Sequence, residues 1–364
     1  MAMSAICPYR AEDIDALLAL IEAITAPERV ITAAGLRSFL SVPGYDPARD
    51  LLVAPSPDGA RLLGARDVRV TDRGDEEVLI LESWGGVHPE VRETDLALDL
   101  LRAALDRAGR LLAERGRTRG ILQARCGEGD AGTRATFAAA GLAFARSLAT
   151  MLKRDLSDVE PSAFRPGIDV LCYRPGVDDE AWVAAFNDAF GDHWGGFMGM
   201  NLPLWRHYLA EPDFNPTISV VAWDGDDLAG FCHCRIDADL NAVNGRRVGM
   251  IRYVGVRPRW RSGGLGKALT RAGLLTLRDA GMDACVLGVD TENVTGAHHL
   301  YARLGFEIVG RQVMYRAEID AVPPARSIRR DDGDGEGDHD PVRSSSPSCR
   351  SMPRGTGAVI AIDA

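Results

Sequence analysis

The chain has 364 residues, of which 46% are hydrophobic and 26% are charged, and its formal net charge at pH 7 is −10. These proportions are those of an ordinary globular protein and exclude a largely disordered chain. The acidic excess argues against a nucleic-acid partner, which would select clustered Lys and Arg side chains. Since the length exceeds what one hydrophobic core usually organises, we expect two domains.

We expect a cytoplasmic protein, because the sequence shows no recognisable targeting signal. The N-terminus lacks a basic start followed by an apolar segment, and the chain has no apolar run of about 18 residues, so no membrane association is expected. The seven cysteines are odd in number and lack CxxC spacing, which favours reduced thiols over a disulfide framework. We therefore predict a cytoplasmic protein that acts on a small molecule, as a monomer or a homodimer.

Residues 1–155 are expected to form the first domain. A short strand at 6–10 leads into a helix over 14–24, where apolar residues recur at helical spacing. A short segment at 86–92 precedes a long helical run, and another at 136–142 precedes a final strand; both serve below as landmarks for comparing the two halves. Strand and helix patterns alternate, which favours an α/β fold built on a mixed sheet.

A polar segment at 156–167, which contains Pro161 and Pro166, is expected to link the first domain to a second one at 168–319. In the second domain we expect strands at 169–173, 217–223, 228–236, 248–256, 284–290 and 306–316, and helices at 178–190, 201–210, 265–280 and 294–303. Residues 320–364 are rich in Ser, Pro, Arg, Asp and Gly, so we expect a disordered tail.

The two domains share three landmarks in the same order. The segment 6–10 matches 170–174, the segment 86–92 matches 255–261, and the segment 136–142 matches 300–306. Each match has the same relation to the strand or helix that follows it. The chain is therefore predicted to be a tandem duplication of one α/β unit.

A glycine-rich turn joins the strand at 248–256 to the helix at 265–280; it reads Arg261-Ser262-Gly263-Gly264-Leu265-Gly266-Lys267. Glycine lets the backbone adopt positive φ and leaves no Cβ between the amides and a bound anion. Unpaired N–H groups and the positive end of the helix converge there, which favours a pyrophosphate. Any tight strand-to-helix turn can use two glycines, so the companions of this turn have to decide its role.

Several residues in order and spacing resemble the GCN5-related N-acetyltransferase (GNAT) superfamily: Arg261, Gly264 and Gly266 of its Arg/Gln-x-x-Gly-x-Gly/Ala signature, and Asn293, Tyr301, Gly305 and Phe306 of its later motif. The resemblance covers residues 168–319. It implies two tandem GNAT-like acyl-CoA N-acyltransferase domains and an N-acetyltransferase that uses acetyl-CoA as cosubstrate.

The resemblance also implies roles for particular residues. The turn from Arg261 to Lys267 would bind the pyrophosphate, Val254 and Val256 would hydrogen-bond the pantetheine arm, and Asn293 would complete the cofactor site. The amine would attack the thioester carbonyl directly, and Tyr301 would be the general acid that protonates the departing thiolate. The alternative for Tyr301 is a helix tyrosine that merely packs against the sheet.

The general base is not assigned by the resemblance. Met250 occupies the position where mycothiol synthases carry a Glu, and a thioether is no useful base at neutral pH. His193 is named as a candidate, since histidine titrates in the required range, although a lone histidine beside a tryptophan is more often a packed structural residue. Further candidates are Asp192, His233, Asp237 and Asp239, and water could also remove the proton.

The sequence Cys232-His233-Cys234 has the residue types of a zinc site but not the geometry. Alternate residues of a strand face opposite sides, so His233 should point away from both cysteines. We therefore expect no metal.

The first domain has lost the residues that carry the chemistry. Its turn reads Arg92-Glu93-Thr94-Asp95-Leu96-Ala97, with both central glycines replaced and two carboxylates that would repel a pyrophosphate. Phe137 stands where the second domain has Tyr301. We predict that the first domain is a catalytically silent copy, with one cofactor-competent centre per chain.

A tandem arrangement with a degenerate first copy resembles mycothiol synthases and a wider set of actinobacterial two-domain acetyltransferases. Met250 favours the wider set, so we expect transfer to a primary amine of a small molecule, with mycothiol synthesis as the first alternative. A different class of answer is a non-catalytic acyl-CoA sensor or scaffold. Tyr301 argues against that class, because a sensor needs no acid.

Overall fold

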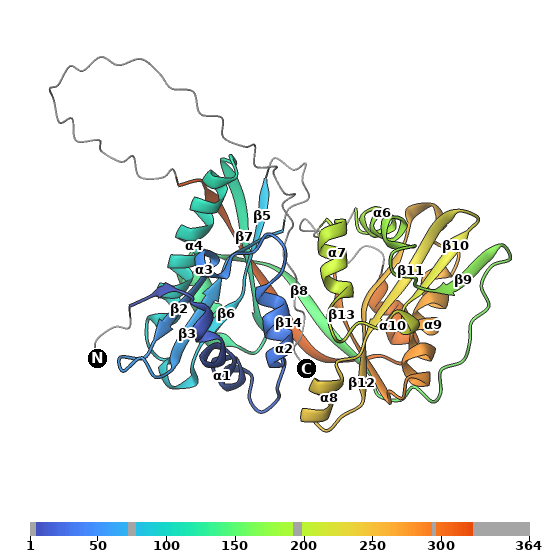
Figure 1. Cartoon of the computed structure of the whole chain (residues 1–364), viewed down its shortest axis with the longest axis horizontal. Coiled ribbons are helices and arrows are strands. Elements are labelled where there is room, and N and C mark those ends of the chain that lie inside the picture. Colours follow the sequence, from blue (N-terminus) through green and yellow to red (C-terminus); the bar gives the residue numbers. More distant parts are fainter. Residues whose placement is uncertain (1–4, 72–77, 192–198, 293–295, 323–364) are drawn as a thin grey trace, which may run out of the picture.

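A computed structural model describes residues 5–71, 78–191, 199–292 and 296–322 of the chain. The molecule has two lobes, one built mainly from each half of the sequence (Figure 1). The elements of the first half are β1 (Cys7–Pro8), α1 (Ile14–Thr25), α2 (Ala33–Leu40), α3 (Pro47–Asp50), β2 (Leu51–Pro55), β3 (Leu62–Asp67), β4 (Arg69–Thr71), β5 (Leu79–Ser83), β6 (Gly85–Val87), α4 (Leu96–Glu114), β7 (Arg119–Gly127), α5 (Ala131–Ala139) and β8 (Ala143–Lys153).

The elements of the second half are β9 (Ile168–Cys172), α6 (Asp179–Ala189), α7 (Leu202–Leu209), β10 (Val220–Asp224), β11 (Asp227–Arg235), α8 (Ala238–Val243), β12 (Val248–Val256), α9 (Leu265–Asp279), β13 (Ala284–Asp290), α10 (Ala297–Arg303) and β14 (Glu307–Asp320). The bounds predicted for β12 and β13 are confirmed. The short helix α8 was not expected; the Asp237 carboxylate caps it by accepting a hydrogen bond from the Leu240 amide at 2.7 Å.

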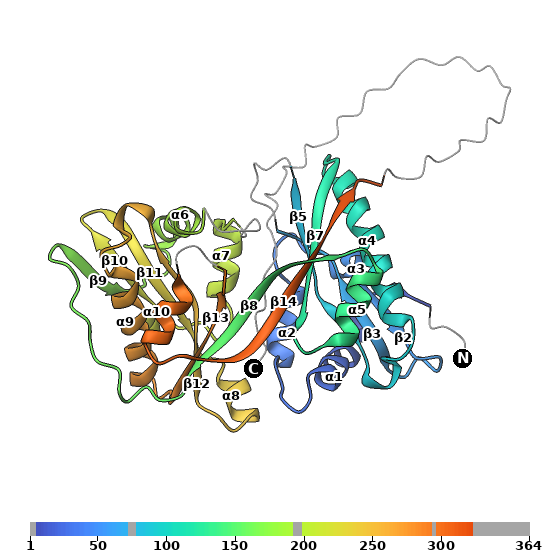
Figure 2. The ribbon, with the colours of Figure 1, turned by 180° about the vertical axis from the view of Figure 1, so that it is seen from behind.

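The last strand of each half crosses into the sheet of the other half. One sheet has the order β1-β2-β3-β6, and the other has the order β4-β5-β7-β14-β8-β13-β12-β11-β10-β9. Strand β8 of the first half pairs with β13, and β14 of the second half pairs with β7. Figure 2 shows β8 and β14 running side by side between the lobes. The two halves therefore share one ten-stranded sheet, an exchange that the tandem repeat did not predict.

Helix α9 packs against β11 and β12 through an apolar stripe that includes Leu269, Leu274 and Leu277. Gly273 allows the close approach, because a Cβ at this position would lie 2.4 Å from the Cys232 Sγ. The sheet holds the turn at the start of α9 in place through this contact. None of the helices in the described ranges combines the length and apolar character needed to cross a membrane.

The opposite face of β11 and β12 carries an aromatic layer supplied by α6 and α7. Trp182 and Trp205 stack with ring centroids 3.5 Å apart, and the Trp205 indole N–H donates to the Tyr173 hydroxyl at 2.8 Å. Tyr253 of β12 packs against the same layer. The strand that bears the predicted cofactor residues is thus covered on both faces.

Candidate active site

Strands β12 and β13 open a gap in the middle of the sheet. They pair as parallel strands only from Val248 to Met250, opposite Ala284 to Val286, although they continue to Val256 and Asp290. Past that point β12 and β13 are no longer paired, so β13 does not cover this edge of β12. Val254 and Val256, the predicted pantetheine-binding residues, lie along this edge.

Two residues of the glycine turn have a left-handed backbone. Gly264, the residue preceding α9, has φ 83°, and Ser262 has φ 64°. This path directs the first amides of α9 into the cavity, and no acidic residue lies in the first turn of the helix. The site therefore presents N–H donors and the positive helix end without a competing carboxylate, as a bound pyrophosphate requires.

The side chain of Arg261 fixes the turn to its surroundings. Its Nε donates to the Val256 carbonyl at 3.1 Å and its Nη2 donates to the Ala189 carbonyl at 2.9 Å. These bonds tie the turn to the end of β12 and to the end of α6. In this structure Arg261 therefore holds the glycine turn in position.

Gly263 faces the segment that links the two halves. A Cβ there would lie 2.6 Å from the Arg165 guanidinium carbon, so the absence of a side chain permits the linker to pack on the turn. Gly263 lines a small cavity of about 370 Å³ beside the turn. Its predicted contact with the cofactor remains a prediction.

A large cavity of about 1510 Å³ is lined by residues from both halves. It contains nine of the predicted site residues: Val254, Val256, Arg261, Ser262, Gly264, Leu265, Gly266, Lys267 and Tyr301. Of the other three predicted residues, Gly263 lines the smaller cavity, and His193 and Asn293, like the candidate Asp192, fall outside the described residues. The structure thus brings the turn, the β12 edge and the tyrosine to one cavity.

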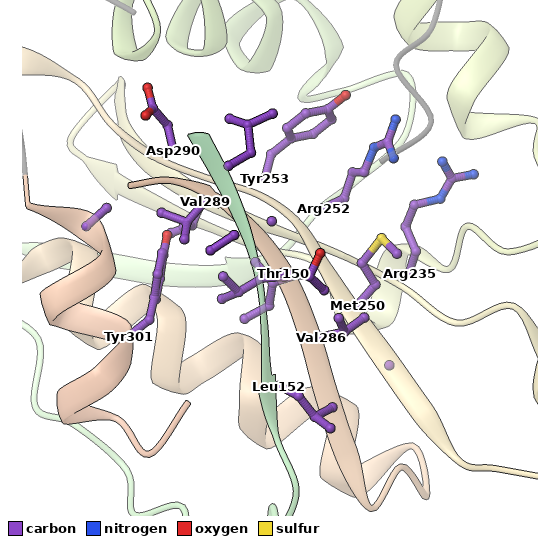
Figure 3. Close-up of a pocket in the computed structure, with 18 of the residues that line it drawn as sticks. Thr150, Leu152, Arg235, Met250, Arg252, Tyr253, Val286, Val289, Asp290 and Tyr301 are labelled. Atoms are coloured by element: carbon purple, nitrogen blue, oxygen red, sulfur yellow. The ribbon is translucent and has the colours of Figure 1, made fainter. Parts of the chain in front are cut away.

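Tyr301 lies on α10 and is only 7% exposed. Figure 3 shows its hydroxyl pointing toward Val289, at the gap between β12 and β13. Burial, reinforced by the nearby Cys232 and Cys285 thiols, raises the pKa of Tyr301 above its ordinary value. The hydroxyl therefore stays protonated at neutral pH, as a general acid must.

Met250 lies in a row of residues across one face of the sheet. The register places it between Arg235 of β11 and Val286 of β13, and Val286 is followed by Leu152 of β8. These side chains lie along one side of the gap (Figure 3). The Arg235 guanidinium forms ion pairs with Glu211 and Asp213.

The other candidates for the base have different surroundings in the structure. His233 is buried beside Trp205 and Tyr253, with its Nδ1 3.2 Å from the Ser219 hydroxyl. Burial lowers the pKa of His233 well below its ordinary value, so it is a neutral packing residue. Asp237 and Asp239 line the large cavity.

The geometry of the Cys-His-Cys segment is as the strand alternation predicted. The Cys232 and Cys234 thiols face α9, with Sγ atoms 3.8 Å apart, whereas His233 faces the aromatic layer. The three side chains cannot converge on one ion.

The equivalent site of the first half is filled by its own side chains. The sheet registers align Arg66 of β3 with Cys232 and Gly85 of β6 with Val254. The Arg66 guanidinium lies 5.7 Å from the centroid of the Phe137 ring and donates from Nη2 to the Gly85 carbonyl at 3.0 Å. The backbone edge that would receive a pantetheine arm is therefore occupied by an arginine.

Sequence reasoning missed the residues that β8 brings to the cavity, among them Leu148, Thr150 and Leu152. It also missed Asp290, whose carboxylate is 3.1 Å from the Arg146 Nε across the junction of the halves. No local pattern marks these positions, because their proximity depends on the exchange of β8 and β14.

Three features are together typical of acetyltransferases that use acyl-CoA: the mixed sheet shared by two lobes, the gap between β12 and β13, and the glycine turn. The profile of the Acetyltransferase (GNAT) family matches residues 181–306. A mycothiol acetyltransferase from Thermobispora bispora is 34% identical over 313 residues, which is 84% of this chain and 96% of the relative. The chain belongs to the GNAT acetyltransferase family.

Further comparisons agree with this family. A mycothiol acetyltransferase from Catenulispora acidiphila is 38% identical over 187 residues, which is 49% of this chain and 58% of that relative. A GCN5-related N-acetyltransferase from Sphaerobacter thermophilus has a TM-score of 0.66 at 23% identity, covering 88% of this chain and 97% of that one. A tandem GNAT protein from the clavulanic acid biosynthesis pathway has a TM-score of 0.64 at 19% identity, covering 88% and 99%. These two structures support the two-domain GNAT fold.

Proposed function

We propose that the protein transfers the acetyl group of acetyl-CoA to a primary amine of a small molecule, at one site formed by β12, α9 and α10. The observation that carries this proposal is the convergence of three features on one cavity: the left-handed turn at Gly264, the open edge of β12 and the buried Tyr301. Acetyl-CoA would supply the activated acyl group, and this chain would bind and orient it.

The roles of the residues follow from their positions. The first amides of α9 hold the pyrophosphate, and the backbone at Val254 and Val256 holds the pantetheine arm in the gap. The acceptor nitrogen forms its bond to the carbonyl carbon as the carbon–sulfur bond breaks. Tyr301 gives its proton to the departing sulfur, since burial keeps its hydroxyl protonated.

The acceptor amine loses a proton to a group other than Met250. Water in the large cavity, or one of the cavity carboxylates such as Asp237 and Asp239, serves this step. A thioether has no usable basicity at neutral pH, so the wild-type rate should rise with the deprotonated fraction of the amine.

Transfer to the mycothiol precursor is the second candidate function. A relative aligned over 84% of this chain is named a mycothiol acetyltransferase. Met250, at the place of the expected carboxylate base, is the feature that speaks against the same reaction here.

The test is a free-thiol release assay with acetyl-CoA and a panel of amines that includes the mycothiol precursor, aminoglycosides, polyamines and small peptides. Release that depends on an amine, with the acetylated amine identified by mass spectrometry, is the expected result. Cofactor binding without transfer to any amine would favour a sensor or scaffold instead.

Calorimetric titration with acetyl-CoA tests the number of sites. We expect one tight site per chain, because Arg66 already bonds the Gly85 carbonyl in the first half. A second site of equal affinity would contradict the silent first half.

A further inference from the structure

The segment that joins the two halves is fixed alongside helix α9 (Figure 2). Leu156 and Val159 of this segment are buried in the core of the second half. The Arg278 guanidinium donates to the Val159 carbonyl at 3.3 Å, and the Arg271 guanidinium donates to the Ser162 hydroxyl at 3.1 Å. The segment therefore has a defined path from the end of β8 to the start of α9.

This path brings Arg165 onto the glycine turn. The Arg165 guanidinium carbon lies 2.6 Å from the point where a Cβ of Gly263 would stand, so the absence of a side chain there leaves room for the guanidinium. Phe164 and Ile168, before and after Arg165, pack against the core cluster that includes Leu265. A cation from the joining segment thus lies against the turn to which we assign the pyrophosphate.

The cavity of about 370 Å³ between this segment and α9 is basic. Arg165, Lys267 and Arg271 line it, and none of its described lining residues is acidic. Lys267 and Arg271 are one helical turn apart and project from the same side of α9. None of the three side chains forms an ion pair with a carboxylate of the described ranges, and the Ser162 hydroxyl that Arg271 bonds is neutral. The three cations repel one another, so a bound anion would be stabilised among them.

The basic cavity adjoins the cofactor site at the glycine turn. Trp260, Gly264, Leu265 and Lys267 line both this cavity and the large one. In CoA, the ribose that carries the pyrophosphate at its 5′ position carries a further phosphate at its 3′ position, one sugar ring away. A cofactor whose pyrophosphate is held by the first amides of α9 can therefore place its 3′-phosphate among the three cations.

We propose that the joining segment completes the cofactor site: Arg165, together with Lys267 and Arg271, binds the 3′-phosphate of CoA. The protein thereby selects CoA over the same molecule without that phosphate. This inference rests on the proposed function for the position of the pyrophosphate. Guanidinium and ammonium groups bind phosphate through charge-assisted hydrogen bonds. A segment that belongs to neither repeat thus sets the selectivity for the cofactor.

The test compares the affinities of CoA and 3′-dephospho-CoA, which differ only in this phosphate, by calorimetry on the full chain without an amine. We expect CoA to bind roughly 10-fold more tightly at low ionic strength, as charge-assisted bonds to partly exposed groups provide. Because Arg165 and Lys267 are exposed, added salt should screen the interaction and reduce this ratio of affinities.

Variants locate the preference on the protein. Arg165→Met should lower the ratio, and the double variant Arg165→Met, Arg271→Met should bring it close to equality. Ser162→Ala is the control for the attachment of the segment, since it removes the bond to Arg271 but no charge. Arg259→Met is the control for charge, since Arg259 lines neither cavity, is 73% exposed and pairs with Asp227. Both controls should keep the wild-type ratio.

Equal affinity of the wild-type protein for the two compounds, or no measurable binding of either, would overturn the proposal. A double variant that keeps the wild-type ratio would overturn it as well, even if both affinities fall, because that result would show a structural role only. The ratio is independent of thiol release, which tests the proposed function. A chain that selects CoA but acetylates no amine would support this inference and contradict that function.

Discussion

The two halves of the chain share the order of their main strands and helices but differ in the side chains at the equivalent site. In the second half, Cys232 and Tyr301 leave the edge of β12 open; in the first half, Arg66 lies over Phe137 and bonds the Gly85 carbonyl. The parallel ladder at the gap extends over residues 248–250 in the second half and over residues 79–83 in the first. At the equivalent site the first half therefore differs in the arginine that occupies this edge and in the phenylalanine that stands in place of the tyrosine.

The first half also contributes to the cavity of the second half. Its last strand, β8, lies beside β13 and contributes Leu148 and Thr150 to the active cavity. In return β14 completes the sheet beside β7. The shape of this cavity thus depends on both halves of the chain.

The largest effect is expected when Tyr301, the proposed general acid that the first half lacks, is replaced. Tyr301→Phe should lower kcat about 10²- to 10⁴-fold, because a positioned general acid contributes this much, while acetyl-CoA affinity changes little. Steady-state kinetics and calorimetry measure the two quantities. Phe137→Tyr, the reverse change in the first half, should leave both unaltered; an unchanged kcat in Tyr301→Phe would refute the role of Tyr301.

The next effect concerns the turn. Gly264→Val should weaken acetyl-CoA binding roughly 10- to 100-fold, since a β-branched residue resists the φ of 83° and the amides would no longer converge. Gly281→Val is the matched control, because Gly281 follows the same helix at its other end with φ 87°. That variant should lose stability but keep its cofactor affinity. Equal affinity for acetyl-CoA in both variants would contradict the role of the glycine turn in cofactor binding.

A smaller effect tests how the two long helices pack. The ninth residue is Gly273 in α9 and Ala104 in α4. Gly273→Ala should lower the free energy of unfolding by about 1–3 kcal/mol, since its Cβ would meet the Cys232 and Cys234 thiols. Gly132→Ala in α5, where the nearest atom is 3.7 Å away, should be neutral or slightly stabilising. Chemical denaturation measures both, and a stable Gly273→Ala would show that the helix can shift.

The smallest expected change is in the alkaline limb of the pH profile. An ordinary tyrosine titrates near pH ~10, but burial raises the pKa of Tyr301. The acid therefore keeps its proton through this range, and kcat should not fall between about pH 8 and 10. A decline with an apparent pKa below ~10, with the protein still folded by circular dichroism, would exclude Tyr301 as the acid.

The sequence by itself determined the features that depend on neighbouring residues. Apolar spacing located β12, β13 and α9, and the glycines of the turn predicted a left-handed backbone that Gly264 adopts. The order of the landmarks revealed two related halves, and Phe137 opposite Tyr301 indicated which half had changed. These properties follow from local sterics and periodicity, which the chain carries at each position.

Only the tertiary structure decided which strands meet. Two equivalent last strands have similar patterns, so periodicity cannot tell whether β8 or β14 pairs with β13; long-range packing and hydrogen bonding choose β8. That choice creates a cavity from both halves and aligns Arg125, Arg146 and Arg316 on its floor. In the four-stranded sheet, the register of β3 and β6 places Arg66 opposite Gly85, whose carbonyl its side chain bonds. Contacts between residues far apart in sequence, rather than any local motif, set the shape and charge of the active site.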